Sequence, residues 1–134
     1  MSTELRVLVV DDMASMRRVV SALLVSIGYS NVVEADNGNT ALVHLRRDRY
    51  DCVVSDWNMP GMTGIDLLRT MRDDPKLKEI PVLLVTAEAS RENVLCAAQS
   101  GASGYIVKPF NSATLESKMS AIMRRHGKEV PKRN

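Results

Sequence analysis

The feature of this sequence that most constrains its fold is a regular alternation between short apolar runs and longer stretches in which apolar residues recur at helical spacing. The runs are rich in Val, Leu and Ile, as expected of strands that are buried on both faces. They cover residues 5–10, 32–35, 52–54, 82–85 and 105–107. A helical pattern follows each run, across residues 16–27, 41–45, 65–71, 94–98 and 115–123.

This alternation predicts one class of fold. A helix that joins one parallel strand to the next covers a face of the sheet. Gly28 and Gly101 stand where the first and fourth helical patterns stop, as is common at helix C-termini. We therefore predict an α/β protein, with a doubly wound five-stranded parallel sheet and helices on both faces.

Length and composition are consistent with a single domain. The chain has 134 residues, 45% of them hydrophobic, and a formal net charge of +2. So small a charge gives no reason to expect nucleic-acid binding. We predict that residues 1–127 form the domain and that residues 128–134, which include three basic residues, form a flexible basic tail.

Targeting and redox features favour the cytoplasm. The N-terminus lacks the basic segment and apolar core of a signal peptide, and no apolar stretch approaches the roughly 18 residues that a membrane span requires. Cys52 and Cys96 show neither metal-site spacing nor a disulfide framework. We expect reduced thiols, no membrane insertion, a cytoplasmic location and a monomer.

Polar residues follow the predicted strands at one end of the sheet. Asp11 and Asp12 come directly after the first strand. Asp56 ends the third strand, Thr86 the fourth and Lys108 the fifth. Because the carboxyl ends of parallel strands meet at one edge, where α/β proteins bind ligands, we expect these five side chains to lie together.

The chemistry of these residues predicts a cation site beside a nucleophile. Three carboxylates in one cleft repel one another unless a cation neutralises them, and Mg²⁺ prefers oxygen ligands. Lys108 offers a mobile charge, and Thr86 a hydroxyl, to the oxygens of a phosphoryl group. The set suits formation of an aspartyl phosphate. Taken singly, each residue has an ordinary interpretation, such as Asp12 capping the first helix.

Four segments resemble those that define the receiver domains of response regulators. They cover residues 9–12, 55–64, 85–87 and 104–110, and the resemblance extends over residues 5–125. Residues 56–60, 86–88 and 101–105 are similar to those of the single-domain receivers that act in chemotaxis. The family implies a flavodoxin-like (βα)5 fold and, beyond what the pattern predicts, the strand order 2-1-3-4-5.

The resemblance also assigns a role to each residue of the predicted site. Asp56 is implied to be the phosphorylated residue. Asp12, Asp56 and the backbone carbonyl of Asn58 are implied to bind Mg²⁺, with Asp11 acting through water. Thr86 and Lys108 are expected to hold the phosphoryl group.

Further positions are implied to act in signalling. Asn58 and Glu88 are expected to tune the lifetime of the aspartyl phosphate, and the peptide bond between Lys108 and Pro109 is expected to be cis. Thr86 and Tyr105 are implied to form the switch. The implied partner surface consists of Arg91, Val94, Tyr105, Val107 and Lys118.

The implied function is phosphotransfer signalling rather than turnover of a substrate. A histidine kinase would phosphorylate Asp56, and the product would bind a target, which for chemotaxis receivers is the flagellar motor switch. A phosphate sink or a phosphorelay intermediate would use the same site. A phosphatase with an aspartyl nucleophile fits less well, because it needs an acid at the position of Asn58. A nucleotide-binding domain would need the GxGxxG motif, which the chain lacks.

Some positions depart from the chemotaxis pattern. Asn111, Ser117, Ala121, the charged segment 46–49 and the basic tail differ from what the motor-binding receivers usually carry. These departures leave the predicted phosphorylation site intact and leave the identity of the partner open.

Overall fold

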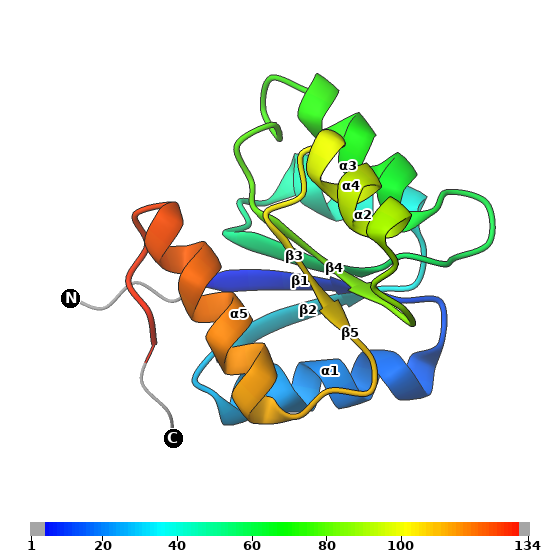
Figure 1. The fold of residues 1–134 in the computed structure, drawn as a ribbon. Coiled ribbons are helices and arrows are strands. Elements are labelled where there is room, and N and C mark those ends of the chain that lie inside the picture. The colour runs from blue at the N-terminus through cyan, green and yellow to red at the C-terminus, as the bar shows by residue number, and fades with distance from the viewer. Residues whose placement is uncertain (1–4, 132–134) are drawn as a thin grey trace.

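The computed structural model describes residues 5–131, in which five strands alternate with five helices (Figure 1). The strands are β1 (Arg6–Val10), β2 (Asn31–Ala35), β3 (Cys52–Asp56), β4 (Val82–Thr86) and β5 (Gly104–Val107). The helices are α1 (Ala14–Ser26), α2 (Gly38–Arg47), α3 (Gly64–Asp73), α4 (Arg91–Gln99) and α5 (Ser112–Arg125). The strands pair in parallel in the order β2-β1-β3-β4-β5. The predicted flavodoxin-like (βα)5 fold is therefore confirmed.

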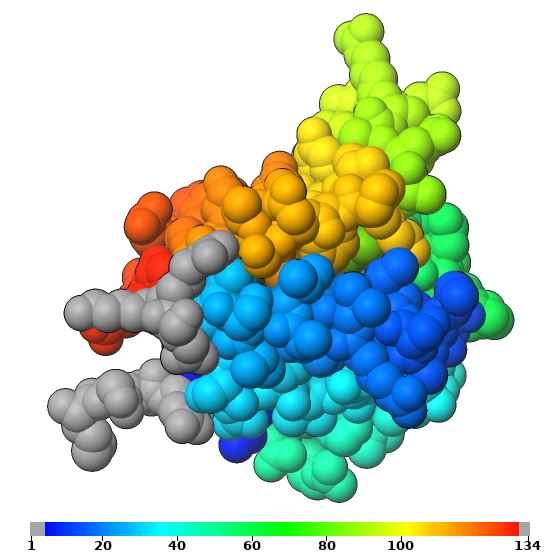
Figure 2. Space-filling model, turned by 90° about the horizontal axis from the view of Figure 1, so that it is seen from below, coloured from blue at the N-terminus to red at the C-terminus, as the bar shows by residue number. Residues whose placement is uncertain are grey.

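The sheet separates two apolar layers, because successive side chains of a strand point to opposite faces. In β1, Val7 and Val9 pack into the layer under α1 and α5, whereas Leu8 and Val10 pack into the layer under α2 and α3. Figure 1 shows α1 and α5 on one face and the other three helices on the opposite face. Figure 2 shows α1 across the centre of its face with the chain of β5 and α5 beside it. Within residues 5–131, the buried polar and charged residues are Asp11, Ser55, Asp56 and Thr86, all at or next to the carboxyl ends of β1, β3 and β4.

Short polar side chains fix where most helices begin. Asn37, Thr63, Ser90 and Asn111 each accept a hydrogen bond from the backbone N–H three residues further on. Asp66 completes a capping box with Thr63 at the start of α3. Asn111, one of the departures noted above, thus has a structural role as the N-cap of α5.

Several large apolar residues within the ranges of the predicted helical patterns are not in the core: Val19, Val25, Val43 and Leu95. Val19 of α1 is 52% exposed and Leu95 of α4 is 51% exposed. Neighbouring residues of a helix point about 100° apart, so Val20 faces the sheet while Val19 lies on the flank. Within residues 5–131, no helix combines the length and the apolarity needed to cross a membrane.

The division at residue 127 stays a prediction, but the residues directly after it contact the domain. The Lys128 N–H donates to the carbonyl of Met123 at 2.8 Å, and Lys128 Nζ lies 2.8 Å from Asp51 Oδ1. Val130 packs against the layer formed with α1 and α5. Residues 128–130 therefore do not extend away from the domain.

Candidate functional site

The register of the sheet brings the predicted site residues to one edge. Val10 pairs with Ser55, Asp56 with Val85, and Thr86 with Val107. Consequently the residues that end or follow β1, β3, β4 and β5 lie side by side. They are Asp11, Asp12, Asp56, Thr86 and Lys108.

Three carboxylates form a cluster at this edge. Asp11, Asp12 and Asp56 each offer one oxygen, and these atoms lie within 4.8 Å of one another. Asp11 is 3% exposed and Asp56 is 6% exposed, whereas Asp12 is exposed. Burial, with repulsion from Asp56, raises the pKa of Asp11 although the Met13 N–H bound to it opposes the shift. A donor set made only of oxygens, with excess negative charge, fits a hard divalent cation such as the Mg²⁺ that the resemblance implied.

The interpretation of Asp12 as the cap of the first helix is wrong. The N-cap of α1 is Met13, and no side chain caps that helix. The Met13 N–H donates instead to Asp11 Oδ1 at 2.9 Å. Within the described residues, the carboxylate of Asp12 has neither a hydrogen-bond partner nor an ion-pair partner, so it remains available to a ligand.

Lys108 neutralises part of the cluster. Its Nζ lies 3.2 Å from Asp56 Oδ1, and about a quarter of the lysine side chain is exposed. The backbone N–H of Lys108 donates to the carbonyl of Thr86 at 2.9 Å, which fixes the end of β5 against the end of β4. The bond between Lys108 and Pro109 is cis, as the resemblance implied. The ammonium group is therefore held beside Asp56 by a flexible stem on a fixed backbone.

The hydroxyl of Thr86 is engaged by the loop that follows β4. It donates to the carbonyl of Glu88 at 2.9 Å, and the Glu88 N–H donates back to it at 3.3 Å. Asn93 Nδ2 donates to the same carbonyl at 3.4 Å. The side chain of Glu88 is exposed. Thr86 and Asn93 together hold the loop that precedes α4.

The loop after β3 is drawn tightly against Asp56. The Gly64 N–H donates to the carbonyl of Trp57 at 2.9 Å. A Cβ at Gly64 would collide with the carbonyl oxygen of Asp56, so only glycine permits this approach. Asn58 lies in this loop with an exposed side chain, and its roles in metal binding and phosphate lifetime stay predictions.

Two residues at the site escaped the sequence reasoning. Arg17 Nη1 donates to the carbonyl of Asp11 at 2.8 Å, and Arg17 Nε lies 3.0 Å from Glu34 Oε1. Asn93 is the other, through its contact with the Glu88 carbonyl. Both are polar residues of helices that follow site strands, which is the only signal the sequence offered. Their contacts support the backbone of the site.

The residues of the implied partner surface come from three neighbouring elements. Arg91 and Val94 are in α4, Tyr105 and Val107 in β5, and Lys118 in α5. Lys118 Nζ lies 4.9 Å from the centroid of the Tyr105 ring, which is partly buried. Val107 is 36% exposed, and the neighbouring Leu95 adds apolar surface. The role of this surface stays a prediction.

Known proteins carry the same domain over nearly their whole length. A family model described as the response regulator receiver domain matches residues 7–120. Chemotaxis protein CheY-3 of Vibrio cholerae serotype O1 is 52% identical over 125 residues, which cover 93% of this chain and 96% of CheY-3. Chemotaxis protein CheY of Pseudomonas aeruginosa is 51% identical over 121 residues, which cover 90% of this chain and 98% of that protein. The solved structure of CheY4 of Vibrio cholerae, 38% identical, has a TM-score of 0.83 and covers 90% of this chain and 99% of its own. The chain therefore belongs to the response-regulator receiver family.

Proposed function

We propose that this protein is a single-domain phospho-acceptor switch in chemotactic two-component signalling. A histidine kinase supplies a phosphoryl group, Asp56 accepts it, and the modified protein binds a target. The observation that carries the proposal is the environment of Asp56, which is 6% exposed, shares an acidic cluster and has Lys108 Nζ at 3.2 Å. A structural ion pair with Lys108 needs only one carboxylate, so the two further carboxylates beside it favour a second cation as ligand.

The proposed reaction is transfer from a phosphohistidine. An Oδ atom of Asp56 forms a bond to phosphorus while the bond from phosphorus to the donor's imidazole nitrogen breaks, and the electron pair leaves on that nitrogen. Asp11, Asp12, Asp56 and the carbonyl of Asn58 are proposed to hold Mg²⁺, which when bound supplies neutralisation of charge on the phosphoryl oxygens. Lys108 exchanges its contact with Asp56 for one with a phosphoryl oxygen.

The product is proposed to persist as a signal. An amide at Asn58 does not protonate a leaving group, so the protein does not act as an aspartyl phosphatase. Asn58 and the exposed Glu88 lie in the loops beside the acceptor, and we propose that they control access of water to the phosphate. Catalysis is then limited to the protein's own phosphorylation and dephosphorylation.

We propose that Thr86 transmits the state of Asp56. Its hydroxyl proton, now bonded to the Glu88 carbonyl, turns to a phosphoryl oxygen, and that carbonyl keeps only the weaker contact with Asn93. The loop before α4 is then free to shift, and Tyr105 turns inward. The surface of Arg91, Val94, Tyr105, Val107 and Lys118 is thereby repacked for a partner helix.

The named relatives are chemotaxis proteins, which supports a role in chemotaxis. We propose that the target is the flagellar motor switch and that the receiver acts in the cytoplasm as a monomer. The test is the affinity for a fluorescent flagellar-motor-switch peptide, with and without beryllofluoride as a phosphoryl mimic. We expect wild-type affinity to rise by about 5–150-fold, the usual range of allosteric coupling. Thr86→Ala should respond far less.

Thr70→Ala is the matched control, because its hydroxyl bonds the carbonyl of Asp66 within α3, away from the site. It should respond as wild type does. No rise in wild-type affinity would favour a phosphate sink or a relay intermediate. An equal rise in Thr86→Ala would rule out the proposed coupling, and turnover of phosphate esters would favour an enzyme.

A further inference from the structure

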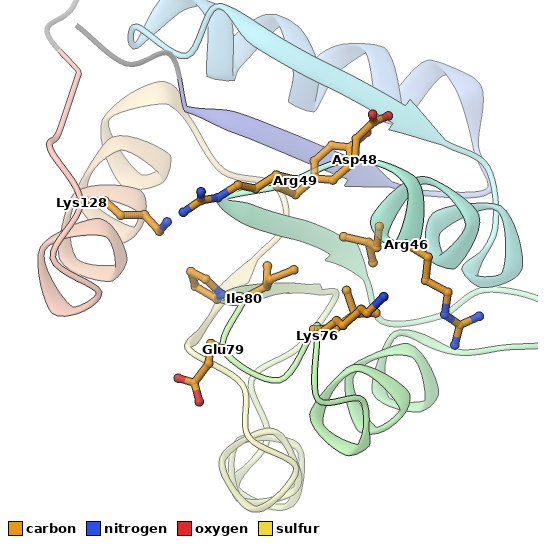
Figure 3. Close-up of a pocket in the computed structure, with 11 residues that line it drawn as sticks. Arg46, Asp48, Arg49, Lys76, Glu79, Ile80 and Lys128 are labelled. Carbon is orange, nitrogen blue, oxygen red and sulfur yellow. The ribbon is translucent and has the colours of Figure 1, made fainter. Parts of the chain in front are cut away.

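A separate cavity lies at the opposite end of the sheet from Asp56. It has a volume of about 470 Å³ and lies where β3 begins, between the end of α2, the segment before β4, and Lys128 (Figure 3). Its floor is apolar, with Leu45, Tyr50 and Leu77 at most 4% exposed. A five-residue strand at about 3.3 Å per residue spans roughly 17 Å, so this cavity is distinct from the phosphoryl site.

The rim of this cavity carries four cationic side chains, Arg46, Arg49, Lys76 and Lys128. In Figure 3, Arg49 and Lys128 extend toward each other at one end, while Arg46 and Lys76 lie at the other. The two acidic residues of the lining, Asp48 and Glu79, turn their carboxylates away from the labelled cations. The rim therefore presents cationic side chains at both ends of an apolar floor.

Two of these cations form ion pairs and two do not. Arg46 Nε lies 3.6 Å from Asp74 Oδ2, and Lys128 Nζ lies 2.8 Å from Asp51 Oδ1. The side chains of Arg49 and Lys76 are exposed and form no ion pair within residues 5–131. The charge of Arg49 acts on the nearby Asp51, but neither side chain is held by a carboxylate at ion-pair distance, so both can meet an anionic ligand.

We propose that this cavity is a docking site for an acidic peptide segment of a partner protein. One apolar side chain of the segment occupies the floor over Leu45, Tyr50 and Leu77, and flanking carboxylates meet the cations at the two ends. Cations at both ends suit a linear segment with acids on either side of its anchor, whereas a single compact anion would contact only one end. The cavity lies at the opposite end of the sheet from Asp56, and none of its lining residues belongs to α4, β5 or α5, so we expect docking there to be independent of phosphorylation.

The experiment is an NMR titration of the full chain with acetyl-Asp-Glu-Leu-Glu-Asp-amide. We expect saturable shifts at the backbone amides of Leu45, Tyr50 and Leu77, and weaker binding as salt is raised. The same peptide with Gly in place of Leu should bind several-fold more weakly. Beryllofluoride should leave the affinity unchanged, which separates this site from the face of α4, β5 and α5.

The variants test the rim directly. The double variant Arg49→Gln with Lys76→Gln should lower the affinity roughly fivefold or more, from the loss of two charge contacts. Arg18→Gln with Lys78→Gln is the matched control, because both residues are exposed, lie outside the lining and form no ion pair within residues 5–131, and the net charge changes equally. The proposal is overturned by an absence of saturable shifts at the floor, by equal losses in both variants, or by equal binding of the Gly peptide. Binding of naphthalene-2-sulfonate in the cavity without binding of the peptide would also overturn it, in favour of a small anion.

Discussion

Neutralising Asp12 tests whether the acidic cluster is assembled at the expense of stability. One oxygen each of Asp11, Asp12 and Asp56 lies within 4.8 Å of the others. At that separation two unit charges repel by about 3.5 kcal/mol at an effective dielectric constant of 20 and by about 0.9 kcal/mol in water. Because Asp12 is exposed, the value for water is the closer one. Relief of two such pairs predicts that Asp12→Asn raises the free energy of unfolding by about 1–2 kcal/mol without metal.

Magnesium should reduce or remove the stability difference between Asp12→Asn and wild type. A ligand at ten times its dissociation constant stabilises the protein that binds it by about 1.4 kcal/mol. Asp12→Asn lacks one of the three clustered carboxylates, so we expect it to gain little from Mg²⁺. The variant should therefore be more stable than wild type in EDTA, and the difference should shrink or vanish in saturating MgCl₂.

Urea unfolding followed by the fluorescence of Trp57 measures both conditions. With a slope of about 2 kcal/mol per M, the midpoint in EDTA should rise by roughly 0.5–1 M. Asp73→Asn is the control, because Asp73 is an exposed carboxylate outside the cluster. A lower midpoint for Asp12→Asn in EDTA, or full stabilisation of that variant by Mg²⁺, would refute the reasoning.

Three further predictions concern the acceptor and two structural contacts. Asp56→Asn should take up no phosphoryl group from acetyl phosphate, measured by intact mass; stable labelling of this variant would contradict the assignment. Burial disfavours the charged form of Asp51, but the hydrogen bonds from Lys128 and the Arg6 N–H outweigh it and lower its pKa below the ordinary 3.8. Stability from this contact is thus complete above about pH 4 and lost as pH falls through the lowered pKa. Lys128→Met should cost about 1–2 kcal/mol in urea unfolding at pH 6, and less below pH 4; a loss independent of pH would exclude the ion pair as its cause. Arg72→Met should cost about 1–3 kcal/mol, because Arg72 donates to the carbonyls of Gly101, Lys78 and Ile80, and an unchanged midpoint would show that water replaces it.

The edge where the site lies could be predicted from the sequence because the strands are short, buried and parallel. Alternation of apolar runs with helical patterns leaves one arrangement of layers, and the residues that follow the runs must share an edge. The positions of Asp11, Asp56, Thr86 and Lys108 at that edge follow from this arrangement alone. The starts of α3 and α4, which Thr63 and Ser90 cap, also depend on local sequence, because an N-cap hydrogen bond joins residues only three positions apart.

Other features depended on contacts that neither spacing nor propensity encodes. The exposure of Val19 and Leu95 follows from which stripe of each helix meets the sheet. The hydrogen bonds from Thr86 and Asn93 to the Glu88 carbonyl depend on how the loop after β4 folds back.

The sequence by itself determined the layers of the fold, the edge that carries the chemistry and the residue types that gather there, because strand and helix periodicity and chain order are local properties. The tertiary structure alone decided which of those residues touch. It made Met13, not Asp12, the N-cap of α1, and it joined Lys128 to Asp51 across 77 positions of the chain. It also placed cations at both ends of the apolar floor of Leu45, Tyr50 and Leu77. These contacts join segments far apart in the chain, and their geometry is set by packing of the whole domain rather than by any local pattern.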